Sequence, residues 1–295
     1  MWTFRAMGTE ITVAAPALAG SAEEHLATRI AELFADTERR FSRFRHDSEL
    51  SVLNASRGSV TVSAELARLL AVARAHVAWT DGLFDPAIGC ALEAAGYDRP
   101  FETGRLDRGT PAHPAPARFA DVRFDEGARV VVRPAHVRID LAGFLKGRTV
   151  DRAAALAPAP AMIDAGGDAR LVGDGPRGRG WPVDVEDPAD ARRVLLTLHL
   201  HDRAVATSAP NRRSWRTGDS IAHHLIDPRT GAPASSDLAQ VTAIADTAER
   251  ADVLAKVVFL LGRDAGASWL VEHGAAGVLV GCDGRVEVVG GVERA

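Results

Sequence analysis

Tight polar turns between short apolar segments constrain the fold of this chain most strongly. Such turns are expected at residues 125–127, at Gly166-Gly167 and at Asp283-Gly284. A turn of two or three residues joins neighbouring antiparallel strands, whereas parallel strands need a long crossover. The sequence therefore predicts hairpins, and it lacks the steady strand-helix alternation of a doubly wound sheet.

Helical segments are interleaved with these hairpins. Glu24 follows Ser21 by three residues, a capping-box pattern that predicts a helix over residues 21–40. Further helices are expected over residues 63–79, 249–261 and 263–273, and an exposed excursion over residues 99–117. Residues 2–14 are expected to form a strand interrupted or bulged at Gly8. We predict an α+β fold with mixed or antiparallel sheets, in a single domain over residues 1–295.

Composition excludes several classes of protein. The 295 residues carry a formal net charge of −4, and the arginines are scattered, so no nucleic-acid partner is expected. Cys90 and Cys282 lie far apart among small or apolar residues, which predicts reduced thiols. No stretch reaches the roughly 18 apolar residues of a membrane span, and no signal-peptide pattern is present. These features predict a cytoplasmic protein without a membrane span.

The segment "RIDLAGFLKGRTVD", residues 138–151, contains an unusual lysine. Ile139 and Leu141 are expected in a strand, with Lys146 at the turn from that strand into a helix. An ammonium group there is costly to desolvate and needs an anionic or carbonyl partner. The glycine-rich turns of the chain match neither GxGxxG nor GxxxxGKS/T, which disfavours the nucleotide folds that carry those motifs.

Two pairs of residues indicate possible chemistry. His223 and His224 face opposite sides if they lie in a strand, so one of them is a candidate general base. Asp252 and Lys256 lie four residues apart on an expected helix. They form either a surface ion pair or part of a site in which the carboxylate helps to hold a hard cation.

Eight segments occur in an order that resembles one known family. They are "MGTEITV", "FSRFRHDSELSVLN", "GLFDPAIG", "IDLAGFLKGRTVD", "IDAGGDARLVG", "ATSAPNRRS", "HHLIDPRTGAP" and "ERADVLAKVVFLLG". On these segments, which cover nearly the whole chain, the protein resembles the ApbE-type FAD:protein FMN transferases. The resemblance implies bound FAD, a magnesium ion at its pyrophosphate, and an acceptor flavoprotein. A threonine or serine hydroxyl of that acceptor attacks the FMN-side phosphorus, and AMP leaves.

The resemblance also implies roles for individual residues. His224 is the implied general base. The implied FAD-binding residues are Met7, Asp85, Lys146, Gly166, Gly167, Asp168 and Ile226. The implied metal site comprises the Gly143 carbonyl, Asp252 and the residue at position 256.

The chain departs from the family pattern at position 256, where Lys256 replaces a threonine that completes the metal site. An ammonium group has donors but no acceptor, so it cannot ligate a cation. Lys256 either takes the place of the cation beside Asp252 or turns away from a weakened metal site. Ala87 and Ala209 also replace a threonine and a glycine of the family pattern. Two alternatives therefore stay open: a flavin-binding protein without catalysis, and an enzyme that hydrolyses FAD to FMN and AMP.

Overall fold

The computed structural model describes residues 1–101, 114–217 and 220–291, which form two compact units. The first unit comprises Met1–Asp36, Phe144–Ala209 and Ser236–Ala295. The second comprises Thr37–Gly143 and Pro210–Ser235. That the whole chain is a single domain stays a prediction.

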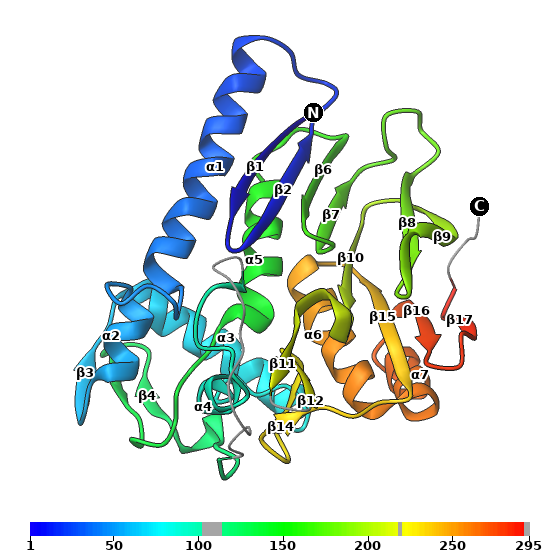
Figure 1. Cartoon of the computed structure of the whole chain (residues 1–295). Coiled ribbons are helices and arrows are strands. Elements are labelled where there is room, and N and C mark those ends of the chain that lie inside the picture. The colour runs from blue at the N-terminus through cyan, green and yellow to red at the C-terminus, as the bar shows by residue number, and fades with distance from the viewer. Residues whose placement is uncertain (102–113, 218–219, 292–295) are drawn as a thin grey trace. The chain divides into compact units, whose positions relative to one another are not determined.

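An eight-stranded sheet is the main element of the first unit (Figure 1). Its strand order is β1-β2-β6-β7-β10-β15-β16-β17, and every neighbouring pair is antiparallel. These strands are β1 Trp2–Ala6, β2 Thr9–Ala14, β6 Ala161–Ala165, β7 Ala169–Val172, β10 Arg203–Ser208, β15 Leu238–Ala245, β16 Ala276–Gly281 and β17 Val286–Val289. A separate hairpin consists of β8 Trp181–Asp187 and β9 Asp190–Leu200.

Helices supply the other part of the first unit's core. They are α1 Ser21–Phe41 as far as Asp36, α5 Ala142–Ala154 from Phe144 onward, α6 Ala248–Leu261 and α7 Arg263–Glu272. In the predicted helix over residues 249–261, Val253 and Val257 are fully buried, and α6 packs on β10 and β15. Burying each such side chain stabilises the fold by roughly 1.5–3 kcal/mol.

The second unit consists of short elements. Its helices are α1 from Thr37, α2 Glu49–Ala55, α3 Ala64–Trp79, α4 Gly89–Ala94, and the short 3₁₀ turns η2 Phe119–Asp121 and η3 Pro210–Arg213. Its strands are β3 Ser59–Thr61, β4 Arg123–Asp125, β5 Val130–Val132, β11 Ser214–Thr217, β12 Ser220–His223, β13 Ile226–Asp227 and β14 Ala232–Pro233. Ser63 begins α3 as its N-cap and accepts a hydrogen bond from the Leu66 N–H.

The α+β prediction is confirmed, and hairpins form at the three predicted turns. The predicted helices over residues 21–40, 63–79, 249–261 and 263–273 are all present within two residues of those bounds. The short helices α2 and α4 have no counterpart in the predictions. Of the predicted excursion over residues 99–117, residues 102–113 lie outside the described part of the chain.

The predicted strand over residues 2–14 is interrupted at Gly8, as one of the two expected forms, and the interruption is a hairpin turn at Met7-Gly8, both with positive φ, that joins two antiparallel strands. Another local prediction was wrong. Residues 139–141 form no strand, and Lys146 lies inside α5. The reason is that the Asn54 side chain bonds both the N–H and the carbonyl of Ile139, where a neighbouring strand would otherwise pair. Asp140 then accepts the Ala142 N–H at 2.7 Å and starts α5.

None of the helices in the described residues combines the length and the apolar character that crossing a membrane requires.

Candidate functional site

Lys146 is held by two oxygen atoms of the β6–β7 hairpin. Its Nζ donates to the Ala165 carbonyl at 2.7 Å and lies 2.5 Å from Oδ2 of Asp168. The Asp168 side chain is only 3% exposed, whereas that of Lys146 is 19% exposed. The lysine therefore reaches from α5 to the hairpin and finds there both kinds of partner that the sequence required, a carbonyl and an anion.

The Gly166-Gly167 turn lies next to this ammonium group. Both glycines have positive φ, 63° and 97°. A Cβ on Gly166 would clash with Oγ1 of Thr9, so glycine is required there. The Gly167 N–H donates to Oδ1 of Asp164 at 3.0 Å, and burial raises the pKa of Asp164. The turn thus brings a second carboxylate to the cluster.

Gly147 allows α5 to approach the first turn of α6 closely. A Cβ at this position would clash with the Ala248 carbonyl. Four residues further on, Asp151 accepts hydrogen bonds from the N–H groups of Ala248 and Glu249 at 2.8 and 2.9 Å. A carboxylate is favourable there because the first N–H groups of a helix have no partner within the helix. The contact places the first turns of α6, which carry Asp252, beside α5.

Asp252 and Lys256 form the ion pair that their spacing predicts. The Asp252 carboxylate is 6% exposed, and its Oδ1 pairs with Nζ of Lys256. Its Oδ2 has no hydrogen-bond partner among the described residues. Burial raises the pKa of Asp252 to about 6; the negative charge of Asp168 adds to the increase, while Lys256 and Lys146 oppose it. Asp252 is therefore a neighbour of the Lys146–Asp168 pair.

The side chains of the implied metal site do not fit a divalent cation. One oxygen of Asp252 is already paired with the ammonium group of Lys256. An ammonium group has no acceptor with which to ligate a cation, and its positive charge repels one. Among the described residues, no three His, Cys, Asp or Glu side chains are grouped so that they could hold a metal ion. Gly143 belongs to the second unit, and its carbonyl stays a predicted ligand.

Two adjacent histidines of the second unit have different surroundings. Nε2 of His223, the last residue of β12, lies 3.1 Å from the Ala234 carbonyl, and its Nδ1 accepts the Leu225 N–H at 3.3 Å. Burial lowers the pKa of His223 and so favours the neutral ring. His224 lies just beyond the strand, with Nδ1 3.4 Å from the Arg213 carbonyl. Of the two rings, His224 is the better candidate base, because both ring nitrogens of His223 are engaged with backbone groups.

The other predicted residues are held mainly by backbone or core contacts. Asp85 is buried and accepts the N–H groups of Ala87 at 2.7 Å and Phe119 at 3.1 Å, and burial raises its pKa. Ile226 is buried in β13, in the second unit. Met7 forms the β1–β2 turn with φ 50° and packs against the first unit's core. Their contacts with FAD stay predictions.

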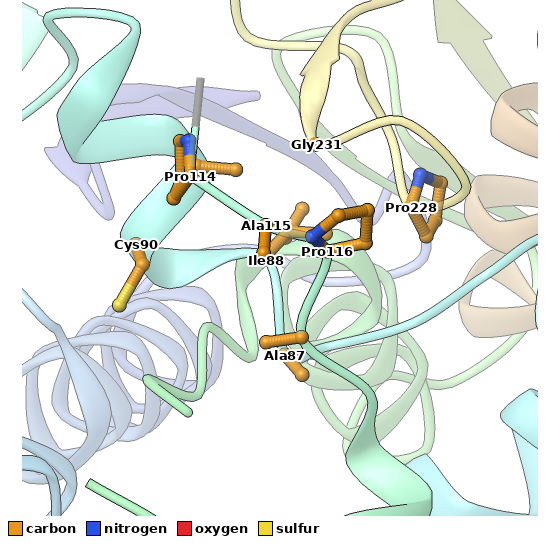
Figure 2. Close-up of a pocket in the computed structure, with 10 residues that line it drawn as sticks. Ala87, Ile88, Cys90, Pro114, Ala115, Pro116, Pro228 and Gly231 are labelled. Carbon is orange, nitrogen blue, oxygen red and sulfur yellow. The ribbon is translucent and has the colours of Figure 1, made fainter. Parts of the chain in front are cut away.

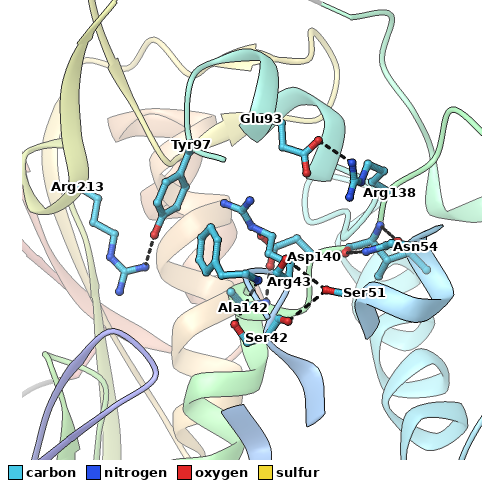
Figure 3. Close-up of polar contacts among 12 residues, drawn as sticks. Ser42, Arg43, Ser51, Asn54, Glu93, Tyr97, Arg138, Asp140, Ala142 and Arg213 are labelled. Atoms are coloured by element: carbon cyan, nitrogen blue, oxygen red, sulfur yellow. Dashed lines mark hydrogen bonds and ion pairs between the residues drawn. The ribbon is translucent and has the colours of Figure 1, made fainter. Parts of the chain in front are cut away.

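The sequence interpretation missed a buried arginine of the second unit. Nε of Arg43 lies 2.7 Å from Asp140, and its guanidinium stacks on the rings of Phe44 and Tyr97 at 4.0 and 4.7 Å. Figure 3 shows Arg43 with Asp140, and Arg213 donating to the Tyr97 hydroxyl at 3.0 Å. Arg43 thereby holds the residue that starts α5. In the sequence, Arg43 is marked only by its position in the segment "FSRFRHD".

A small pocket in the second unit has no room for a nucleotide. It is lined by ten residues, among them Cys90, Pro114, Pro116 and Gly231 (Figure 2). Its volume is about 10 Å³, roughly what one water molecule needs.

The model of the ApbE family matches residues 7–280. The chain belongs to the ApbE family. It is 27% identical to an FAD:protein FMN transferase of Haemophilus influenzae over 256 residues, which are 80% of this chain and 72% of the relative. It is 31% identical to that of Rhodobacter capsulatus over 226 residues, 73% of this chain and 43% of that longer protein.

Solved structures agree with the family assignment. The crystal structure of the ApbE protein of Thermotoga maritima superposes with a TM-score of 0.86 at 29% identity, covering 98% of this chain and 96% of that one. The flavin transferase ApbE of Vibrio cholerae has a TM-score of 0.79 at 22% identity, with the same coverage, and supports the fold alone.

Proposed function

We propose that this chain is an FAD:protein FMN transferase that attaches FMN to a threonine or serine of an acceptor flavoprotein. The observation that carries the proposal is the cluster of Lys146, Asp168 and the Gly166-Gly167 turn in a member of the ApbE family. An ammonium group beside a glycine turn is suited to a phosphate, which a lysine binds as a point charge. The relatives named FAD:protein FMN transferase support the same activity.

The proposed reaction displaces AMP from the pyrophosphate. The acceptor hydroxyl oxygen bonds to the FMN-side phosphorus while the bond from that phosphorus to the bridging oxygen breaks, and AMP leaves with that oxygen. His224 accepts the hydroxyl proton. Lys146 neutralises charge on the pyrophosphate, because such a displacement needs positioning and electrostatic stabilisation more than covalent participation by the protein.

The test combines the protein with FAD and an extract of its source organism. AMP is followed by chromatography, and covalently bound flavin is followed by fluorescence after denaturing electrophoresis. Transfer predicts AMP and a fluorescent protein band in equal amounts. AMP with free FMN and no band would instead show hydrolysis, and bound FAD without AMP would show a binding protein.

A further inference from the structure

Lysine is rare in this chain, and both lysines lie in one charged cluster. Of the 35 lysine and arginine residues, only Lys146 and Lys256 are lysines. Everywhere else arginine supplies the positive charge. A guanidinium is a planar fork of donors, whereas an ammonium group is compact and has three donors around one nitrogen. The two positions that keep lysine therefore indicate a requirement for a small point charge.

Each ammonium group is fixed by a buried carboxylate. Asp168 holds Lys146, and Asp252 holds Lys256. The two pairs are neighbours, because the charges of Asp168 and Lys146 both act on Asp252. Asp168 and Asp252 are nearly inaccessible, while about a fifth of each lysine side chain is exposed. Positive charge is therefore presented outward and negative charge is kept inside.

Each nitrogen also keeps donor capacity. Nζ of Lys146 contacts the Ala165 carbonyl and Asp168, and Nζ of Lys256 contacts the carboxylate of Asp252 and, at 3.3 Å, its carbonyl. An ammonium group has three donors. One N–H of each lysine is thus left without a partner among the described residues, and two such donors match an anion with two charged groups.

We propose that Lys256, with Lys146, replaces the divalent cation, so that this chain binds the diphosphate of its nucleotide without metal. This inference rests on the proposed function for the identity of the nucleotide, FAD. The Lys256 ammonium group occupies the Asp252 oxygen that a cation would use, and it repels a cation at the other oxygen. A covalently attached charge needs no free metal ion to complete the site.

The first experiment measures FAD affinity by flavin fluorescence, in EDTA and in excess magnesium. Wild type is expected to give the same affinity in both, within about twofold. Lys256→Thr is expected to bind about 10- to 100-fold more weakly in EDTA, the scale of one charge-assisted hydrogen bond. Magnesium should restore the variant, because threonine supplies an oxygen ligand where the ammonium group stood. Arg250→Thr removes the same charge from the same helix and should leave FAD affinity unchanged.

The outcomes separate the two proposals. If magnesium raises the FAD affinity of wild type about 10-fold or more, the inference is wrong. The proposed transferase function is unaffected by that result. Equal affinity of wild type and Lys256→Thr in EDTA overturns it as well. If FAD binds in neither buffer, the proposed function is wrong. The inference about Lys256 is then tested by the binding of inorganic pyrophosphate in the second experiment.

The second experiment uses the scarcity of lysine. Protein labelled with ¹³C at lysine Cε gives only two side-chain NMR signals. Inorganic pyrophosphate added in EDTA is expected to move both signals of wild type, and Lys256→Arg assigns them. If pyrophosphate leaves the Lys256 signal in place, the inference is wrong. This measurement needs neither turnover nor a folded Lys256→Thr variant.

Discussion

The two units hold their candidate site residues in different ways. In the first, Asp168 and Asp252 are buried and paired with lysines whose ammonium groups retain donors. In the second, Asp85 and His223 are satisfied by backbone N–H and carbonyl groups. A carboxylate saturated by backbone supports the local fold, whereas a charge pair with remaining donors can still bind an anion. The proposed pyrophosphate site therefore rests on the lysines of the first unit, and the proposed base, His224, belongs to the second.

Lys146→Met should have the largest effect on stability, because it leaves the buried Asp168 carboxylate without its cation. We expect the free energy of unfolding to fall by about 3 kcal/mol, measured by urea denaturation at neutral pH. The control is Arg192→Met, which removes an exposed ion pair with Asp190 and should leave stability nearly unchanged. If both changes lowered the free energy of unfolding equally, the Lys146–Asp168 pair would contribute no more to stability than an exposed ion pair.

His224→Ala should separate binding from chemistry in the second unit. FAD affinity is expected to stay unchanged, while AMP release with acceptor slows by roughly 10²-fold or more, the scale of a general base. Single-turnover AMP release measures this effect. His25→Ala, on the exposed face of α1, serves as the control. Equal rates for His224→Ala and wild type would exclude His224 from proton transfer.

Asp85→Ala tests whether this carboxylate serves the local fold. The substitution leaves two N–H groups, of Ala87 and Phe119, without their acceptor, and we expect a loss of about 2 kcal/mol in stability. Asp121→Ala, at an exposed position two residues after Phe119, should be nearly neutral. A stable Asp85→Ala protein that no longer binds FAD would instead show that Asp85 contacts the nucleotide.

His223→Gln should give the smallest effect, visible only as a change in pH dependence. Burial lowers the pKa of His223 in the folded protein, so the unfolded chain binds this proton more tightly. The contribution of the neutral His223 ring to the free energy of unfolding is therefore complete above about pH 6.5, and it is lost as the pH falls below that value. Between roughly pH 5 and 6.5, unfolding free energies should fall less steeply in His223→Gln than in wild type. An unchanged slope would mean that His223 is not buried as a neutral ring.

The sequence predicted the elements whose signals are local. The helices over residues 63–79 and 249–261 and the turn at Gly166-Gly167 each depend on a few neighbouring residues, and each is present. The site pairing of Asp252 with Lys256 was also predictable, because it depends only on helical spacing.

Long-range contacts explain what the sequence did not predict. Ile139 and Leu141 look like a strand, but Asn54, 85 residues earlier, supplies the hydrogen bonds that a strand partner would. Arg43 pairs with Asp140 across a similar separation and has no local pattern. The Lys146 partners, Ala165 and Asp168, depend on the way α5 packs against the β6–β7 hairpin.

The sheet of the first unit also sets an order of events during synthesis. β2 pairs with β6, so Ile11 lies opposite Ala165, and most of the second unit is encoded between them. A ribosome adding about 5–20 residues per second needs on the order of ten seconds to produce that interval. During this time the N-terminal hairpin has an unpaired edge. The second unit's first segment, Thr37–Gly143, is synthesised before β6, and the sheet is completed only when β17 follows.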